Sequence, residues 1–440
     1  MTKNIDIVKY KDAIKDLNTY RIYGRVVEVI GLIVESLGPD SKIGDVCLIY
    51  PSKSKEAIKA EVVGFKNNRI ILMPLGELGA IGPGCDVVNT GSPLMIKVGT
   101  QLLGRILNGL GEPIDGGKLP VGLKPYMTNQ KPPNPLKRPR IKEPIHLGVR
   151  AIDALLTVGK GQRMGIFSGS GIGKSTLLGM IAKYTSADIN VIALIGERGR
   201  EVKEFIEKDL GEEGQKKSVI VVATSDQPAL VRIKGAIIAT SIAEYFRDSG
   251  LNVNLMMDSV TRYAMSLREV GLAIGEPPAT KGYTPTVFAD LPKLLERSGN
   301  SELGSITALY TVLVDADDMN EPIADAVRGI LDGHIVLDRK IAQRGHYPAI
   351  DILQSVSRLM IDIVSKEHNK SSENLKRLLA IYRESEDLIN IGAYKNGTNP
   401  LIDKAIKYNT TIEEFTKQGI NEHCAFEESI DKIISTFKEI

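Results

Sequence analysis

A short glycine-rich segment is the first part of the sequence whose residue types and spacing could do chemistry. It reads Ser168-Gly169-Ser170-Gly171-Ile172-Gly173-Lys174-Ser175-Thr176 and follows an apolar run of strand length, 164–167. Glycines adopt backbone angles that other residues avoid, so successive N–H groups of such a loop can converge on a phosphate. The N-terminus of the helix expected after the loop adds a partial positive charge. The segment therefore predicts a phosphate-binding loop between a strand and a helix.

The side chains that end this loop suit a nucleoside triphosphate with magnesium. Lys174 is expected to neutralise β- and γ-phosphate oxygens, and the Ser175 hydroxyl is expected to bind Mg²⁺. The residues predicted to contact ATP are Ser170, Gly171, Ile172, Gly173, Lys174, Ser175 and Thr176. Ser168 stands where the strict pattern has glycine. We expect that change to be tolerated, because the position contributes mainly its backbone.

Two acidic residues follow other apolar runs. Asp258 ends the run 253–257, and Glu197 comes soon after the run 191–195. The carboxyl ends of parallel strands meet at one edge of a sheet, where such folds bind ligands. Asp258 is expected to hold a water on Mg²⁺, and Glu197 could polarise the water that attacks the γ-phosphate. Taken alone, Asp258 could also be a turn or helix cap, and Glu197 half of a surface ion pair.

The elements that must position these residues fall into three regions. Apolar runs of strand length alternate with helical patterns from about 148 to 358, which predicts a parallel sheet covered on both faces. The preceding short β-branched runs, separated by turn residues, favour a small β-barrel. Lys and Glu interleave with Leu and Ile after residue 358, as is typical of helices. We predict an α/β chain with a β-barrel at 21–96, a nucleotide-binding domain at 97–362 and a helical domain at 363–440.

Two further segments have distinct compositions. A predicted amphipathic helix at 1–20 carries on one face Ile7, Tyr10, Ile14 and Leu17. That face could pack on its own domain or bind a partner. Residues 118–142 hold six prolines and seven basic residues without an acid. Proline excludes a central strand or a long helix there, so we predict an extended connector in preference to a nucleic-acid-binding arm.

The overall composition excludes several classes of protein. With 440 residues, 42% of them apolar and 25% charged, the chain resembles neither a disordered protein nor a coiled coil. A formal charge of +2 argues against bulk electrostatic binding of a polyanion. Three scattered cysteines suggest unpaired thiols in a reducing compartment. Neither a signal pattern nor an apolar run of about 20 residues is present, so a cytoplasmic protein without membrane insertion is expected.

Several longer stretches, together with these motifs, resemble a known family. The stretches are 103–108 with 111–115, 196–202 and 275–283. They are similar to the rotary and export ATPases with a RecA-like core. Residues 294–299, 317–322 and 345–351 favour the ATPases of bacterial type III protein export, most closely the flagellum-specific branch, over the catalytic subunit of ATP synthase.

The resemblance implies roles for five residues. Glu197 would activate water, and Arg198 and Arg262 would lie on the phosphate side of the site. Tyr347 would pack on the adenine ring. Arg358 would be an arginine finger that reaches into the neighbouring subunit's site. From their residue types alone, Tyr347 could be a core or interface tyrosine and Arg358 part of an intersubunit ion pair.

The resemblance also implies a fold and a function. The fold is a RecA-like P-loop core preceded by a β-barrel and followed by helices. The function is Mg²⁺-dependent ATP hydrolysis by a homohexamer that powers flagellar protein export, peripheral at the inner face of the cytoplasmic membrane. The implied partners are a stator-like regulator at the N-terminal helix, a central stalk protein, the export gate and chaperone–cargo complexes, without nucleic acid.

Four alternatives stay open at this point. They are a virulence type III secretion ATPase, the catalytic subunit of a rotary ATP synthase, a nucleotide-binding subunit without turnover, and an RNA translocase. Glu197 argues against the subunit without turnover. The absence of Trp and an aromatic content of 5% argue against RNA stacking.

Overall fold

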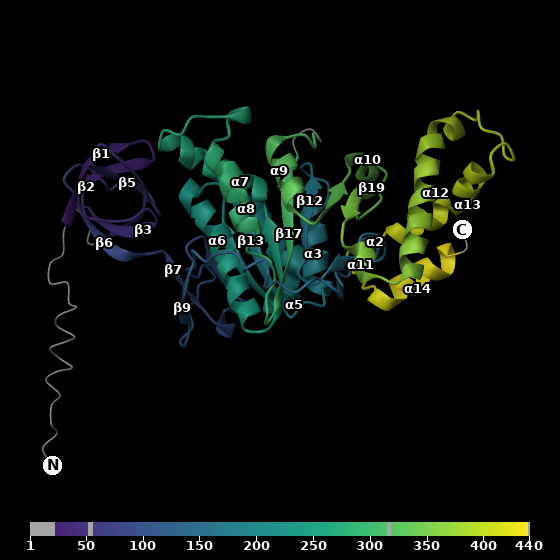
Figure 1. Cartoon of the computed structure of the whole chain (residues 1–440), viewed down its shortest axis with the longest axis horizontal. Helices are drawn as coiled ribbons and strands as arrows, with labels where there is room; N and C mark the ends of the chain where they lie inside the picture. Colours follow the sequence, from purple (N-terminus) through teal and green to yellow (C-terminus); the bar gives the residue numbers. More distant parts are fainter. Residues whose placement is uncertain (1–22, 52–55, 315–317, 439–440) are drawn as a thin grey trace, which may run out of the picture. The chain divides into compact units, whose positions relative to one another are not determined.

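The computed structural model describes residues 23–51, 56–314 and 318–438 (Figure 1). Its internal contacts divide the chain into two compact units, with the boundary after Leu94. The amphipathic helix predicted at 1–20 lies outside the described residues. Across the described ranges, every helix is too short or too polar to span a lipid bilayer.

The first unit contains a closed β-barrel, as predicted. The barrel order is β1-β2-β5-β4-β3-β6. The strands are β1 (Tyr23–Ile30), β2 (Ile33–Leu37), β3 (Asp45–Tyr50), β4 (Ile58–Lys66), β5 (Arg69–Pro74) and β6 (Asp86–Pro93). Alternate side chains of a strand point to opposite faces, so one set fills the interior. Cys47 and Cys85 belong to that buried core, and Cys424 is buried elsewhere, so the expected unpaired thiols are confirmed.

The second unit is built on a largely parallel sheet. Its strand order is β19-β18-β12-β17-β15-β13-β14-β8, with the short β16 beside β17. The strands are β8 (Ile106–Asn108), β12 (Arg163–Ser168), β13 (Ile189–Ile195), β14 (Ser218–Ala223), β15 (Asn252–Asp258), β16 (Gly299–Asn300), β17 (Ser305–Leu313), β18 (Gly333–Leu337) and β19 (Ile350–Ser357). Only β16 and β19 pair antiparallel among these strands. The predicted parallel sheet is confirmed.

Helices cover both faces of this sheet (Figure 1). They include α3 (Lys174–Tyr184), α4 (Gly199–Glu204), the π-helix η2 (Phe205–Leu210), α5 (Gly211–Lys216), α6 (Ala229–Asp248), α7 (Val260–Ala273), α8 (Pro285–Leu295), α9 (Pro322–Ile330) and α10 (Arg339–Gln343). Every residue of β13 is buried. Ile192 and Leu194 belong to one hydrophobic cluster with residues of α3, and α6 also packs against the strand. A strand covered on both faces needs no polar alternation, which explains its continuous apolar run.

The C-terminal region is helical and shares a hydrophobic core with the sheet domain. Its helices are α11 (Met360–Ile363), α12 (Lys366–Asn390), α13 (Pro400–Thr416) and α14 (Phe426–Phe437). Phe415 of α13 and Phe437 of α14 join one buried cluster with Ile152 of α2 (Arg150–Leu155) and with residues of the sheet. The helical fold predicted for this region is confirmed.

The proline-rich segment 118–142 contains neither a helix nor a central strand. Its one strand, β9 (Lys124–Met127), pairs with β7 (Met95–Val98) in a separate two-stranded sheet. Arg297 links the segment to α6. Its Nη1 donates to the carbonyl of Thr128 in the segment at 3.1 Å, and its Nη2 forms a buried ion pair with Glu244 Oε2 of α6 at 2.5 Å. The two charged side chains are only 6% and 1% exposed.

Arg297→Met is expected to lower the free energy of unfolding by about 3–5 kcal/mol, because it leaves the Glu244 carboxylate buried without its counter-ion. Chemical denaturation of the full chain measures this. The double variant with Glu244→Leu should recover most of the loss, since an apolar pair has no unpaired charge. A single variant as stable as the unmodified chain would show that the pair does not stabilise the fold.

Candidate active site at the carboxyl edge of the sheet

The glycine-rich segment forms a loop between β12 and α3. Gly171 and Gly173 adopt positive φ angles of 75° and 92°. The φ angle of Gly169 is not positive. Gly173 is the N-cap of α3, whose first turn contains no acidic residue. The free backbone N–H groups of that turn and the positive end of the helix therefore favour an anion at this place.

Three charged side chains converge beside this loop. Lys174 Nζ lies 2.6 Å from Asp258 Oδ1 and 3.3 Å from Glu197 Oε1. The side chains are 12%, 4% and 15% exposed, in the order Lys174, Asp258 and Glu197. They come together because β12, β15 and β13 are parallel and end at one edge of the sheet. The predicted juxtaposition of both acids with the loop lysine is present in the structure.

The surroundings keep Lys174 charged. Burial acts to lower the pKa of its ammonium group, but the charges of Asp258 and Glu197 outweigh burial and raise that pKa. Thr311 of β17 donates its hydroxyl to Asp258 Oδ1 at 2.7 Å, which fixes the carboxylate. A permanently charged ammonium group at the first residue of α3 suits the binding of a triphosphate.

Glu197 has a different electrostatic environment. Burial, followed by the nearby charge of Asp258, raises the pKa of its carboxyl group to about 7, although Lys174 opposes the change. A hydrogen bond with the Glu201 side chain acts in the same direction as burial. A group that titrates near the working pH can accept a proton and release it again, as a general base requires.

The pH dependence of kcat/KM for ATP should report this carboxyl group. If the ionised form of Glu197 is the base, kcat/KM is expected to rise about tenfold from pH 6 to pH 8, because the raised pKa leaves most of the group protonated at pH 6. Glu201→Gln should move the rise to lower pH, since Glu201 helps to raise the pKa of Glu197. The phosphates of ATP titrate identically with both enzymes. The same midpoint in both would argue that Glu197 is not the titrating base.

The side chains predicted to hold magnesium fit that ion. Ser175 is the second residue of α3, and Asp258 ends β15 at the same edge of the sheet. In the described part of the chain, no cluster of three or more His, Cys, Asp or Glu side chains could hold a metal on its own. Magnesium commonly binds through one or two protein oxygens together with substrate phosphates and water. A hydroxyl and a carboxylate beside the phosphate loop match that mode.

The remaining predicted residues on this edge differ in their exposure. Tyr347 is 46% exposed. Its ring lies beside the loop, 3.6 Å from the position that a Cβ atom on Gly173 would occupy. Arg262 of α7 packs closely on Gly196, and its Nε is buried without a hydrogen-bond partner. Arg198 points outward: its side chain is 77% exposed and lies 3.7 Å from Glu201.

Arg358 lies at the opposite end of the parallel strands, beside the start of β18. It follows β19, whose Ser357 pairs with Gly333 at the start of β18. The phosphate loop follows Ser168, which pairs with Leu337 at the end of β18. Four strand steps, about 13 Å, separate the two ends of β18. Tyr347 thus precedes one end of β19 and Arg358 follows the other, so the structure does not bring Arg358 to the site of its own chain.

Sequence reasoning missed two contributors. Thr311 orients Asp258, and Glu201 binds the catalytic candidate Glu197. Thr311 is a polar residue inside the apolar run 306–314, and that position was the available signal. Glu201 of α4 follows Glu197 by four positions in the sequence, but Glu197 itself precedes the helix, so that spacing was a weaker signal.

Comparison with known proteins supports this reading of the chain. Family models match at residues 26–91 (ATP synthase alpha/beta family, beta-barrel domain), 148–357 (ATP synthase alpha/beta family, nucleotide-binding domain) and 364–435 (T3SS EscN ATPase C-terminal domain). The flagellum-specific ATP synthase of Bacillus subtilis is 61% identical over 425 residues, which cover 96% of this chain and 97% of the relative. The type 3 secretion system ATPase of Xanthomonas euvesicatoria is 48% identical, and the match covers 94% of each chain.

Solved structures agree with these relatives. The assembled ATPase EscN of the enteropathogenic E. coli type III secretion system matches with a TM-score of 0.89 at 47% identity, covering 94% of this chain and 99% of EscN. EscN in complex with its central stalk EscO matches with a TM-score of 0.86, covering 93% and 100% of the two chains. The resemblance inferred from the sequence motifs is confirmed. This chain belongs to the ATP synthase alpha/beta family, in the branch that contains the flagellum-specific and type III secretion ATPases.

Proposed function

We propose that this ATPase powers flagellar type III protein export. The observation that carries the hydrolysis of ATP is the convergence of Lys174, Glu197 and Asp258 beside the phosphate loop. This arrangement provides a charge for the triphosphate, a base for water and a carboxylate for magnesium. The higher identity to a flagellum-specific relative, 61% against 48%, supports flagellar export over virulence secretion.

In the proposed reaction the phosphates bind to the backbone N–H groups of 170–174 and to Lys174. Ser175 and Asp258 would hold magnesium, which supplies charge neutralisation at the β- and γ-phosphates. Glu197 takes a proton from the attacking water. Arg262 and Arg198 are assigned to the phosphate side, although Arg198 must turn inward from its exposed position to reach it. Tyr347 is assigned to the adenine ring.

The position of Arg358 supports a site shared between subunits. An exposed arginine at the far edge of the sheet can serve catalysis only in another copy of the chain. We assign it as the arginine finger of a homohexamer in which each subunit completes its neighbour's site. The related EscN is described as an assembled ATPase and as a complex with its central stalk EscO.

The division of labour that we propose follows the predicted boundaries. Residues 1–20 would bind a stator-like regulator, and residues 21–96 form the barrel. Residues 97–362 would hydrolyse ATP, with 118–142 as the connector. A central stalk protein, the export gate and chaperone–cargo complexes would be further partners of the assembled ring, and residues 363–440 form its helical region. The ATPase would act at the cytoplasmic face of the membrane, where partner proteins would hold it.

The proposal is tested with purified full-length chain and in cells. ATP hydrolysis per chain should rise with protein concentration as rings form, and Lys174→Ala should abolish nucleotide binding. A Bacillus subtilis strain without its flagellum-specific ATP synthase should swim when it expresses this chain but not the Lys174→Ala variant. A flat, negligible rate at every concentration would indicate a missing partner chain, as in the synthase alternative. Hydrolysis without restored swimming would overturn the flagellar assignment.

A further inference from the structure

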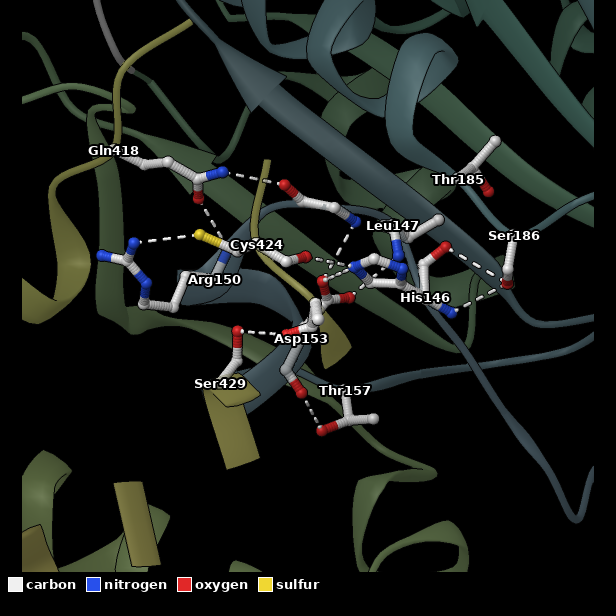
Figure 2. A network of polar contacts seen from close by, with 12 residues as sticks. His146, Leu147, Arg150, Asp153, Thr157, Thr185, Ser186, Gln418, Cys424 and Ser429 are labelled. Atoms are coloured by element: carbon white, nitrogen blue, oxygen red, sulfur yellow. Dashed lines mark hydrogen bonds and ion pairs between the residues drawn. The ribbon is translucent and has the colours of Figure 1, made fainter. Parts of the chain in front are cut away.

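Gln418 is a buried side chain whose amide joins distant parts of the chain. It lies in the loop after α13 and is 4% exposed. Its Oε1 accepts from the backbone N–H of Arg150 at 2.8 Å, and its Nε2 donates to the carbonyls of Gly148 at 2.9 Å and Glu422 at 2.8 Å. Figure 2 shows the amide facing the backbone at the start of α2. The amide therefore fixes the C-terminal loop to the nucleotide-binding domain.

Arg150 strengthens the same junction from the other side. The end of α13 presents carbonyl groups that have no partner within the helix. Arg150 Nη1 donates to three carbonyls there, those of Phe415 and Lys417 at 3.2 Å each and that of Glu414 at 3.5 Å. Its Nη2 donates to Cys424 Sγ at 2.9 Å and pairs with the Glu422 carboxylate. Because Arg150 is 9% exposed, these contacts are made largely out of water.

The backbone of this loop also contacts Tyr347. The N–H of Gln418 donates to the carbonyl of Tyr347 at 2.9 Å. Beside it, the Thr416 hydroxyl and His346 Nε2 lie 3.2 Å apart. One residue thus holds α2 through its side chain and Tyr347 through its backbone, and the Tyr347 ring lies next to Gly173 of the phosphate loop.

We propose that Gln418 is a positioning residue for the base-binding face of Tyr347. The C-terminal helical region would then set the strength of base binding, while the phosphate loop binds the triphosphate independently. A binding surface that is already ordered loses less entropy when the ligand arrives, so fixing Tyr347 increases affinity for the base. The inference rests on the proposed role of Tyr347 at the adenine ring.

The test compares ATP with inorganic tripolyphosphate, which has the phosphates but no base. Binding to the full-length chain is measured by calorimetry for the unmodified protein, Gln418→Met and Gln418→Glu. Both variants keep the length of the side chain, and both lack the Nε2 donor. We expect affinity for ATP to fall about tenfold, a typical loss for one weakened aromatic contact to a base, while affinity for tripolyphosphate stays unchanged.

Two further variants serve as references. Tyr347→Ala gives the largest loss that the base contact can produce. Gln162→Met removes another buried amide, at the end of the parallel strands away from the phosphate loop. Its Oε1 accepts from Gly159 N at 2.8 Å, and its Nε2 donates to Ser357 Oγ at 3.1 Å. It should destabilise the fold without changing the ratio of the two affinities. Thermal unfolding of all variants provides the comparison of stability.

Each outcome decides the question. A selective loss of ATP affinity in the Gln418 variants supports the proposal. An equal loss of both ligands, or the same selective loss in Gln162→Met, would show a general structural role and overturn it. If Tyr347→Ala alone changes the ratio, Gln418 does not position the ring. If Tyr347→Ala leaves the ratio unchanged, the proposed adenine site is itself wrong.

Discussion

The Glu197→Gln variant is expected to bind ATP normally but to hydrolyse it about 10²- to 10⁴-fold more slowly. The amide has nearly the shape of the carboxyl group, but it cannot accept a proton from water. Lys174 keeps its shorter contact, 2.6 Å to Asp258, so the residues that bind the phosphates stay in place. Loss of turnover with retained binding would mark a residue that acts in the transition state.

Calorimetry with ATP and steady-state hydrolysis at saturating ATP measure the two effects separately. Glu204→Gln is the matched control, because this exposed glutamate of α4 pairs only loosely with Lys208, at 3.9 Å. It should keep both binding and turnover. Hydrolysis at the unmodified rate by Glu197→Gln would show that the base has been assigned to the wrong residue.

The Arg358→Ala variant should lose about 10³ to 10⁵ in turnover, the range known for arginine fingers. The finger's charge meets the γ-phosphate as negative charge develops in the transition state. Because Arg358 and the phosphate loop lie at opposite ends of β18, the loss must arise in a neighbour's site. Addition of the variant to unmodified chain should therefore lower the rate by more than dilution does.

A mixture of two inactive variants gives the sharper measurement. Lys174→Ala lacks the phosphate contact and Arg358→Ala lacks the finger, so some interfaces between them combine an intact loop with an intact arginine. Partial recovery of hydrolysis is expected from that mixture and from neither variant alone. Arg377→Ala, on the exposed face of α12, controls for the loss of an arginine elsewhere. A mixture that stays inactive would argue against a site shared between subunits.

The sequence alone determined the parts of the site that depend on neighbouring residues. The order strand, loop and helix follows from an apolar run, positions where glycine permits positive φ, and a helical pattern, all within about 20 residues. Asp258 and Glu197 could be assigned to the same edge because parallel strands end together. The barrel, the sheet and the C-terminal helices were predictable for the same reason, since the spacing of apolar residues records which faces are buried.

Only the tertiary structure decided the contacts between segments far apart in the chain. The hydrogen bond from Thr311 to Asp258 crosses 53 positions, and the bond from Gln418 N to Tyr347 O joins two different regions. Likewise, only the register of β18 with β12 and β19 placed Arg358 at the edge away from its own loop. A local pattern determines which face of an element is buried, whereas the partner across that face depends on how the whole chain packs.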